Sequence, residues 1–373
     1  MHVVSKLDAG GLENGIVNLA NHFDKDTFRI EIVCLHGLGK LAERIKPSVK
    51  TLVLNTKEGN FVKQFSELYR LFLHKRPRIV HTHGWGQGSF VSILAARLAG
   101  VAIVINGEHG SFFLKPHQVF LQRLVYKLCN SILSVSDSLK NEIVSRLNIR
   151  PDKVFVIQNG VDTEIFCGKN HAQYAKSVSV NSPKVDEHNG FKIVCIGSLK
   201  KSKNQMLLLR AAKLLKPKIG SLRFRVFLVG EGNDREKLEA FVEESSLTEE
   251  VQFLGLRNDI PYLLYLANVL VLPSLSGSEG LSNVILEAMS SGIPVIATNS
   301  IGSNELVKEG FNGYIIEDND ELLSCRIRDL ILNQALATRM GFNARQYVIK
   351  NYSLKKMIDG YFVFYSKLAG LNQ

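Results

Sequence analysis

Short apolar runs alternate with longer amphipathic stretches along almost the whole chain. Continuous apolar runs of four to seven residues are typical of strands buried on both faces, and apolar residues repeated every three or four positions indicate helices. Helical patterns occur, for example, at 17–22, 64–73 and 90–98. This alternation favours an α/β fold with parallel, doubly wound sheets joined by crossover helices. Strands are predicted at residues 28–34, 78–81, 102–105 and 132–135, and again at 192–196, 223–229, 251–254, 269–272 and 294–297.

A polar stretch separates the two series of strands. Residues 168–190 are rich in Lys, Asn, Ser and Asp and poor in large apolar residues, which is typical of an interdomain linker. At 373 residues the chain is long enough for two hydrophobic cores. We therefore expect one domain at 1–167, a second at 191–352 and a ligand cleft between them. The last segment, 353–373, is rich in Tyr and Phe and is expected to form a helix that packs back across both domains.

The chain is basic, with 46 Lys and Arg against 35 Asp and Glu and a net charge of +11. The excess is larger in the first half, where a basic surface could contact an anionic membrane or phosphate groups, or could simply be solvated. Both interpretations stay open. No helix-turn-helix, zinc-finger or stacking-aromatic signature is present, so nucleic acid is not an expected partner.

Targeting and redox signals are weak. The longest apolar candidate, 262–272, is interrupted by Asn268 and is too short to span a bilayer, and no secretory signal opens the chain. We expect a cytoplasmic protein, with peripheral attachment to the inner face of the membrane left open. The five cysteines are widely spaced and odd in number, which favours reduced thiols over disulfides or a metal site.

The stretch from residue 278 to 298, SEGLSNVILEAMSSGIPVIAT, carries the clearest chemistry. Turn-forming residues precede a helical run at 284–289, and the unit follows the strand at 269–272, so a loop and a helix start should lie at a strand's carboxyl end. Backbone amides at such a position bind phosphate, which makes Gly280, Leu281 and Ser282 candidate ligands of a diphosphate. Glu279 and Glu287 flank this loop. Either glutamate alone could be an ordinary helix residue, but together they favour a site for a nucleotide-linked sugar.

A second glycine-opened turn follows the strand at 192–196. Its sequence, GSLKKSKNQ, brings Ser198, Lys200 and Lys203 to a strand end, where lysines can make charge-assisted hydrogen bonds to a diphosphate. A solvated lysine turn is the alternative, more so for Lys200 than for Lys203. The loop VGEGND at 229–234 lacks the third glycine of the dinucleotide-binding fingerprint, so a nicotinamide cofactor is not indicated.

The Glu279–Glu287 stretch and its flanks resemble the signature of retaining glycosyltransferases with the GT-B fold (glycosyltransferase family 4, group 1). The extension GGLENGIVNL after Gly10 is similar to sugar transferases of bacterial exopolysaccharide gene clusters. The resemblance implies two Rossmann-like domains that face each other across a cleft. It also implies that Glu279 contacts the donor sugar, that Glu287 binds the ribose, and that the amides at 280–282 hold the diphosphate.

The same resemblance assigns further donor contacts. Lys203 matches a lysine of the family pattern, whereas Ser198 stands where an arginine is usual, and Lys200 is the expected substitute. The nucleotide base is expected against the backbone near Leu256 and Arg257, after the strand at 251–254. The chain thus matches the family's donor pattern except at one phosphate contact.

In the first half, the resemblance places the loop with Gly10 and Gly11 at the acceptor side. Glu13 is a candidate acceptor-side group, although an early helix carboxylate is the stronger interpretation. By resemblance His109 contacts the donor sugar close to the reaction centre and His83 lines the acceptor side, while His81 is expected to be structural. The pair His81 and His83 has metal-ligand spacing, yet no third ligand accompanies it, so no metal site is expected.

One further pattern invites a metal interpretation. Asp318-Asn-Asp320 matches the Asp-x-Asp of metal-dependent transferases, but it follows GYIIE at 313–317 and is expected to be a polar turn before a helix from Glu321. We therefore expect neither an obligatory metal nor a cofactor.

The predicted function is transfer of a hexosyl unit, with retention, from a nucleotide diphosphate sugar. A UDP-sugar is favoured as donor, a glycan or lipid-linked molecule as acceptor, and cell-surface polysaccharide biosynthesis as the setting. Two alternatives stay open: a nucleotide-sugar epimerase of the same architecture, and a catalytically silent partner docked on the membrane.

Overall fold

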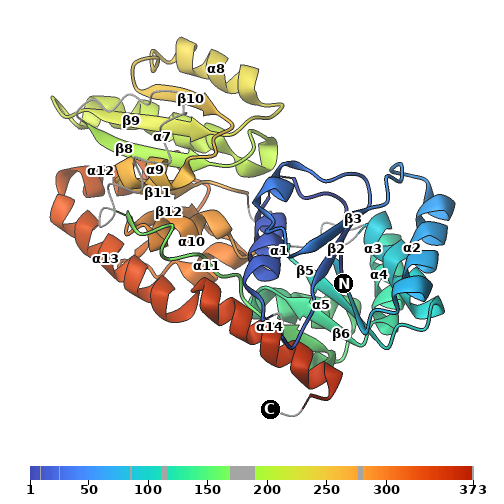
Figure 1. The fold of residues 1–373 in the computed structure, drawn as a ribbon. Helices are drawn as coiled ribbons and strands as arrows, with labels where there is room; N and C mark the ends of the chain where they lie inside the picture. Colours follow the sequence, from blue (N-terminus) through green and yellow to red (C-terminus); the bar gives the residue numbers. More distant parts are fainter. Residues whose placement is uncertain are drawn as a thin grey trace. The chain divides into compact units, whose positions relative to one another are not determined.

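The computed structural model describes residues 1–8, 10–24, 26–84, 86–110, 116–168, 190–275 and 280–371. Its contacts group the chain into two compact units (Figure 1). The first combines Met1–Gly160 with Leu354–Gln373, and the second is Val161–Ser353. Each unit is a parallel sheet with helices packed on it.

The first unit is built on a seven-stranded sheet in the order β3-β2-β1-β4-β5-β6-β7, and every strand pair is parallel. This order reverses direction between β1 and β4, which in doubly wound sheets is the point outside which ligands bind. The elements are β1 (His2–Val4), α1 (Gly11–His22), β2 (Glu31–Cys34), the 3-10 helix η1 (Lys40–Arg44), β3 (Lys50–Val53), α2 (Phe61–Lys75), β4 (Ile79–His83), α3 (Gln87–Leu98), β5 (Ile103–Glu108), α4 (Pro116–Leu128), β6 (Ser131–Ser134), α5 (Asp137–Leu147), η2 (Pro151–Lys153), β7 (Val154–Val156) and α14 (Leu354–Ala369).

The last helix, α14, completes the first unit although it follows the whole second unit in sequence. Its apolar side joins a cluster with residues of α1, β5 and β6. The cluster includes Phe23, Ile105 and Leu133 from the early chain and Phe364 and Tyr365 from α14. Figure 1 shows α14, in red, beside the green strand β6.

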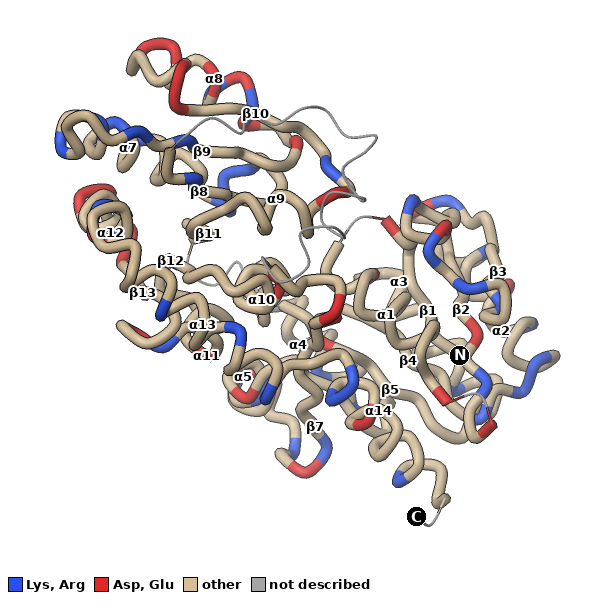
Figure 2. Tube along the Cα trace, turned by 60° about the vertical axis from the view of Figure 1, so that its left-hand side comes forward, with Lys and Arg blue, Asp and Glu red and all other residues tan. Residues whose placement is uncertain are grey.

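The second unit repeats the topology with six parallel strands in the order β10-β9-β8-β11-β12-β13. Its reversal point lies between β8 and β11. Charged residues lie mainly on helices and loops, and the strands are mostly uncharged (Figure 2), as expected for strands covered on both faces. The elements are β8 (Phe191–Ile196), η4 (Lys201–Lys203), α7 (Gln205–Leu215), η5 (Lys216–Lys218), β9 (Phe224–Val229), α8 (Arg235–Glu244), β10 (Val251–Gly255), α9 (Ile260–Leu266), β11 (Val269–Leu272), α10 (Asn283–Ser290), β12 (Val295–Thr298), α11 (Ile301–Leu306), β13 (Gly313–Ile316), α12 (Asp320–Leu332) and α13 (Gln334–Asn351).

All nine predicted strands are confirmed, with ends that shift by up to about three residues. The strand predicted from residue 28 begins only at Glu31, because the ladder with β1 starts at the pair His2–Ile32. The helical pattern at 17–22 belongs to α1, which begins earlier, at Gly11. The pattern did not reveal the short strands β3, β7 and β13.

The boundary of the second unit lies before the predicted linker. Residues 161–168 belong to the second unit, where the Arg345 guanidinium donates to the carbonyls of Phe166 (3.0 Å) and Thr163 (3.4 Å). Most of the predicted linker, residues 169–189, lies outside the described residues.

Candidate functional site

In the second unit, the chain turns tightly where β8 ends. The Gly197 N–H donates to the Val229 carbonyl (2.9 Å), which ties the turn to the end of β9. A Cβ on Gly230 would lie 2.1 Å from the Gly197 carbonyl oxygen, and a Cβ on Gly232 would lie 2.1 Å from that of Leu199. Only glycine permits backbones to approach so closely, so this edge of the sheet is built from main chain.

The predicted phosphate contacts of this turn differ in exposure. The side chains of Ser198 and Lys200 are exposed, whereas Lys203, at the end of η4, is half-buried. Side-chain carbons of Lys203 lie 3.8 Å from the position that a Cβ on Gly197 would take. The Lys203 side chain therefore crosses the strand end, and it is the more firmly placed of the two candidate lysines.

The loop after β11 lies beside this turn. The Leu275 N–H donates to the Ser202 carbonyl (2.9 Å), so the two loops meet at the reversal point of the sheet. Glu279, the predicted donor-sugar contact, lies outside the described residues, as do residues 276–278.

Gly280, Leu281 and Ser282 lead directly into α10 and are buried. A Cβ on Gly302 would lie 1.5 Å from the Gly280 carbonyl oxygen, so the first turn of α11 holds this loop by direct backbone packing. The positive end of the α10 dipole points at the same place and favours an anion there. Glu287 is half-buried on α10, two turns further along.

The predicted base-binding segment follows β10. Leu256 is 65% exposed, whereas the Arg257 side chain is fully buried in a bidentate ion pair with Asp259. Arg257 Nε lies 2.8 Å from Oδ1 of Asp259, and Nη2 lies 2.7 Å from Oδ2. Because the guanidinium serves this pair, the backbone of the segment and the exposed Leu256 side chain remain available to a nucleotide base. That contact stays a prediction.

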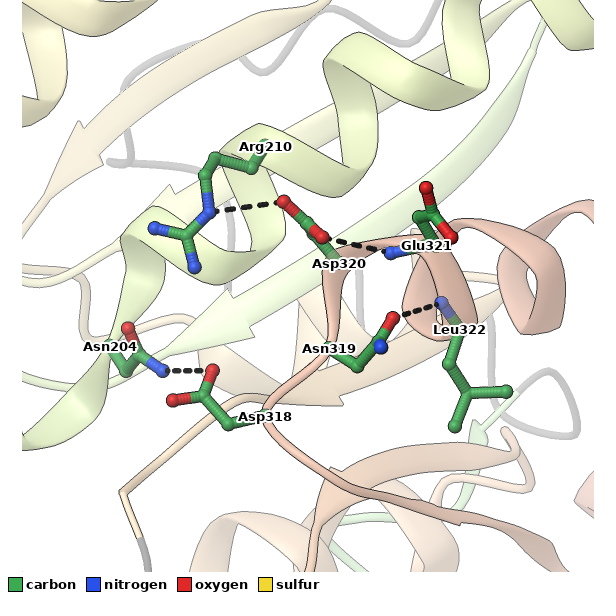
Figure 3. A network of polar contacts seen from close by, with 7 residues as sticks. All are labelled: Asn204, Arg210, Asp318, Asn319, Asp320, Glu321 and Leu322. Atoms are coloured by element: carbon green, nitrogen blue, oxygen red, sulfur yellow. Dashed lines mark hydrogen bonds and ion pairs between the residues drawn. The ribbon is translucent and has the colours of Figure 1, made fainter.

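The turn with Asp318 and Asp320 is structural, as predicted (Figure 3). Asp318 accepts a hydrogen bond from Asn204 Nδ2 (3.1 Å), and Asp320 pairs with Arg210 Nε (3.2 Å). Asn319 caps α12 by accepting from the Leu322 N–H (2.8 Å). Both carboxylates thus tie the start of α12 to the loop and helix that follow β8.

In the first unit, the Gly10–Gly11 loop forms the start of α1, with Gly10 as N-cap. The Glu13 carboxylate folds back over this cap, and a Cβ on Gly10 would lie 2.2 Å from Glu13 Oε2. Partial burial raises the pKa of Glu13. This position is that of an early helix carboxylate, the stronger of the two interpretations offered by the sequence.

Glu13 also lines a cavity of about 580 Å³ at the carboxyl ends of β1, β2 and β3. Lys6, Lys57, Asp8 and Glu58 contribute opposite charges to its wall. Such a mixture offers both donors and acceptors of hydrogen bonds, which is the chemistry that hydroxyl-rich ligands require.

Four histidines gather on the neighbouring strands β1 and β4 and directly after the end of β5. His83 Nδ1 lies 3.3 Å from His109 Nε2, so the structure brings the two predicted site histidines together. His83 Nε2 lies 2.9 Å from His2 Nδ1, and His81 Nδ1 lies 2.7 Å from the Tyr365 hydroxyl. Sequence reasoning missed His2 and Tyr365. The available signal was the strand order, which puts β1 next to β4 and aligns His2 with His81.

Burial controls the charge of this cluster. Desolvation lowers the pKa of His109 to about 4 and holds the pKa values of His2, His81 and His83 well below the usual range. All four imidazoles are therefore neutral at pH 7.

Glu108, next to His109 in β5, shows the opposite shift. Burial raises its pKa to about 8 despite hydrogen bonds from Asn106 and Gln122. A neutral carboxyl and neutral imidazoles thus share the end of this strand near neutral pH.

Comparison with known proteins follows the same division of the chain. Residues 9–165 match the family model described as Glycosyltransferase Family 4, and residues 181–347 match that of Glycosyl transferases group 1. A UDP-Gal:alpha-D-GlcNAc-diphosphoundecaprenol alpha-1,3-galactosyltransferase of Escherichia coli is 30% identical over 350 residues, which cover 90% of this chain and 88% of that protein. This chain is a group 1 glycosyltransferase. The glycosyltransferase is also 30% identical to the putative glycosyltransferase EpsD of Bacillus subtilis, over 73% of this chain and 72% of that protein.

Solved structures confirm the fold of this glycosyltransferase. A glycosyltransferase from Rickettsia africae superposes with a TM-score of 0.82 at 20% identity, covering 100% of this chain and 98% of the other. HepE from Anabaena, solved in complex with UDP-glucose, gives 0.80 at 18% identity and 98% coverage of both chains. The two doubly wound units are thus those of the GT-B fold. Among the described residues, none of the helices is both long enough and apolar enough to cross a bilayer.

Proposed function

We propose that this glycosyltransferase moves a hexosyl unit from a UDP-sugar to a lipid-linked or glycan acceptor, with retention of anomeric configuration. The carrying observation is the meeting of the β8 and β11 loops at the reversal point of the second sheet, where Lys203 and the Gly280 loop lie. HepE, of the same fold, binds UDP-glucose, and the E. coli relative uses UDP-Gal and a diphosphoundecaprenol-linked acceptor. Polysaccharide biosynthesis is the setting that these relatives suggest.

In this proposal the second unit holds the donor. Lys203 and the amides at 280–282 stabilise the departing diphosphate, with Lys200 as the substitute for the arginine that Ser198 replaces. Glu287 accepts hydrogen bonds from the ribose, and the backbone at Leu256 and Arg257 contacts the base. Glu279 positions the sugar. The leaving phosphate itself takes the proton of the acceptor hydroxyl.

The first unit supplies the acceptor side. The cavity that Glu13 lines suits a hydroxyl-rich acceptor. Gly10 and Gly11, which precede Glu13 at the start of α1, and His83 at the end of β4 are the further acceptor-side residues of the proposal. His109 makes a hydrogen bond to the reacting sugar. No step requires a metal ion, which agrees with the structural use of Asp318 and Asp320.

The donor half of the proposal is tested by nucleotide-sugar binding. A panel of UDP-, GDP- and ADP-sugars is added to the purified protein and thermal unfolding is followed. We expect only UDP-sugars to protect, by about 2.7 kcal/mol at one hundred times the dissociation constant. Protection by none of the panel would contradict the proposal.

Matched lysine variants locate the diphosphate. Lys203→Ala should weaken UDP-sugar binding by roughly ten- to a hundredfold, the range for a hydrogen bond to a charged group. Lys201→Ala removes an exposed lysine from the same 3-10 helix and should have little effect. Equal losses in both variants would place the diphosphate elsewhere.

The reaction itself is tested with a diphosphate-lipid acceptor. Transfer predicts release of UDP only when acceptor is present, and NMR of the product should show the anomeric configuration of the donor. Conversion of the sugar without acceptor would indicate an epimerase. Binding without any turnover, unchanged by Glu287→Gln, would indicate a catalytically silent partner.

We also propose that helix α4 touches an anionic membrane. Its residues Phe120, Leu121, Leu124 and Leu128 are 40–62% exposed, and their spacing puts them on one side of the helix. The opposite side, with Gln122, Val125 and Tyr126, is buried. An outward apolar stripe is unusual for a solvated helix and typical of interfacial ones.

Basic groups lie at the end of this α4 stripe. Lys153 Nζ donates to the Lys127 carbonyl (3.0 Å), and Arg97 donates to the Leu128 carbonyl. Each such cation near an anionic surface contributes about 1 kcal/mol to attraction. A bilayer contact would also bring the enzyme to a lipid-linked acceptor.

Vesicle sedimentation tests the contact. Leu124→Glu should reduce binding to phosphatidylglycerol vesicles at least about tenfold, because it puts a charge into the exposed apolar stripe that would enter the bilayer. Val62→Glu is the control, since Val62 is a 76% exposed apolar residue on α2. Equal binding of wild type to phosphatidylcholine vesicles, or no loss in Leu124→Glu, would contradict the proposal.

A further inference from the structure

A continuous series of hydrogen-bonding distances runs from helix α14 to His109. The Tyr365 hydroxyl lies 3.3 Å from His2 Nε2, and His2 Nδ1 lies 2.9 Å from His83 Nε2. His83 Nδ1 then lies 3.3 Å from His109 Nε2. Both nitrogens of His2 and of His83 are used, so the contacts form one chain through two imidazole rings. We refer to Tyr365, His2, His83 and His109 as the histidine chain.

The sheet fixes the histidine chain in place. His2 is aligned with His81 in the β1–β4 ladder, and His81 and His83, two residues apart, lie on one face of β4. Gly107 on β5 leaves the room for the rings. A Cβ there would lie 2.9 Å from His81 Nε2, 3.1 Å from His109 Nε2 and 3.3 Å from His83 Nδ1.

The ring geometry favours shared protons over a shared metal ion. His2, His81 and His83 do offer nitrogens within 4.8 Å of one another. However, the rings of His2 and His83 are tilted by only 13°, with nitrogens 2.9 Å apart, which is a donor–acceptor distance. His81 and His83 stack at 4.2 Å between centroids, so their in-plane lone pairs do not converge.

Neutral imidazole has one N–H and one bare nitrogen, so the two hydrogen bonds of each ring run in the same direction along the chain. If one ring accepts at its first nitrogen, it donates from its second, and the next ring must accept. The tautomers of His2, His83 and His109 are therefore coupled. A single proton at the end of the chain decides all three.

The hydroxyl proton of Tyr365 has this role, because its direction decides whether the phenol oxygen donates to His2 or accepts from it. Its hydroxyl lies 2.7 Å from His81 Nδ1 and 3.3 Å from His2 Nε2. The distance of 2.7 Å lies in the usual range of an O–H donor, whereas 3.3 Å is beyond that range and suits only a weaker contact. We therefore assign the O–H to the shorter contact. Tyr365 thus donates to His81 and accepts from His2, which leaves His2 Nδ1 to accept from His83 Nε2–H. His83 Nδ1 in turn accepts from His109 Nε2–H.

We propose that Tyr365 and His2 are positioning residues that keep Nδ1 of His109 bare, as an acceptor for a hydroxyl of the reacting sugar. This role for His109 rests on the proposed function, whereas its tautomer does not. His81 takes part by holding the Tyr365 proton, and its own Nε2 faces Gly107 without a hydrogen-bond partner among the described residues.

The decisive measurement is the tautomer of His109. In protein labelled with ¹⁵N-histidine, long-range ¹⁵N–¹H correlation spectra distinguish the two neutral tautomers. We expect the Nε2–H form at His109 in wild type and a mixture of both forms in Tyr365→Phe. The same single tautomer in both proteins, or the Nδ1–H form in wild type, would overturn the proposal.

Tyr361→Phe is the matched control. Tyr361 lies one turn before Tyr365 on α14, is also buried, and has its ring centroid 5.7 Å away, but its hydroxyl is not part of the histidine chain. Its loss removes one buried oxygen in the same way. A tautomer change in Tyr361→Phe equal to that in Tyr365→Phe would attribute the effect to general loosening and overturn the proposal.

Kinetics extend the test to function. Tyr365→Phe should lower kcat roughly two- to tenfold with little change in KM for the UDP-sugar, the range that one net hydrogen bond supports. If wild type transfers no sugar, the proposed function fails while the NMR result still decides the histidine chain. Titration with ZnCl₂ closes the metal alternative: tight 1:1 binding that is lost in His81→Ala would overturn the chain.

Discussion

The two units share one topology but differ in what packs at their strand ends: backbone in the second unit and side chains in the first. In the second unit, glycines 230, 232 and 302 let main chain pack on main chain, and the described part of that unit contains no histidine. In the first unit, buried imidazoles fill the same place. The difference teaches that one fold can order its strand ends either by backbone contact or by a side-chain network. The first should be sensitive to substitutions that add side-chain volume, and the second to changes in pH.

The largest effect is expected at a buried ion pair of the second unit. Asp259→Ala should destabilise that unit by about 3–5 kcal/mol, because it leaves the Arg257 guanidinium uncompensated. Urea unfolding followed by circular dichroism measures the loss. In the control, Asp359→Ala breaks the exposed pair with Lys355, whose side chains are 84% and 59% exposed, and should cost about 0.5 kcal/mol or less. Comparable losses would show that burial does not decide the outcome.

Acid should act on the first unit. Because burial lowers the pKa of His109 to about 4, the folded state resists a proton that the unfolded chain takes up near pH 6.5. Stability is therefore fully present above that pH and falls as the pH drops toward 4, by about 1.4 kcal/mol per pH unit for each such histidine. Fluorescence of the single tryptophan, Trp85, within the chain range of the first unit, follows the transition.

Glu108 provides the internal check on this pH dependence. Its pKa of about 8 lies above the unfolded value, so its contribution to the free energy of unfolding decreases as the pH rises. Between pH 6.5 and 4.5 this contribution therefore offsets the pH dependence of one histidine. Glu108→Gln should steepen the acid loss. A flatter acid limb in the variant would contradict these protonation states.

A smaller loss is expected from the backbone contact at Gly302. Gly302→Ala puts a methyl group 1.5 Å from the Gly280 carbonyl oxygen and should cost about 1–3 kcal/mol, the range for overpacking, together with UDP-sugar affinity. Gly15→Ala in α1 meets nothing within 4 Å and should be neutral or stabilising. Calorimetric titration measures the dissociation constant for UDP-glucose in both variants. An unchanged dissociation constant in Gly302→Ala would show that Gly280 is not part of the donor site.

The smallest effect should be the same in both units. Asn319 caps α12 and Asn60 caps α2, each by accepting from the backbone N–H three residues ahead. Asn→Ala at either position should cost about 1 kcal/mol, since a cap is a local interaction. A several-fold difference between the two melting shifts, after correction for unit size, would show that even local bonds depend on their unit.

The sequence predicts local features well and long-range ones poorly. The apolar runs locate nine strands, and the turns at Gly197 and Gly280 are visible because their glycines, lysines and cap residues are neighbours in the chain. His2 and Tyr365 escape prediction because 363 positions separate them and only strand order and the return of α14 bring them together. The proposed donor site of the second unit can therefore be predicted from a motif, whereas the network of the first unit cannot.

The return of α14 also has a consequence for synthesis on the ribosome. The first 160 residues emerge early, but the helix that covers one face of their sheet is translated only after the entire second unit. Until then the apolar partners of α14, such as Phe23 and Leu133, stay uncovered and open to chaperones or to aggregation. The first unit is thus the first to be started and the last to be completed. A chain terminated before α14 would contain the whole second unit but only an incomplete first unit.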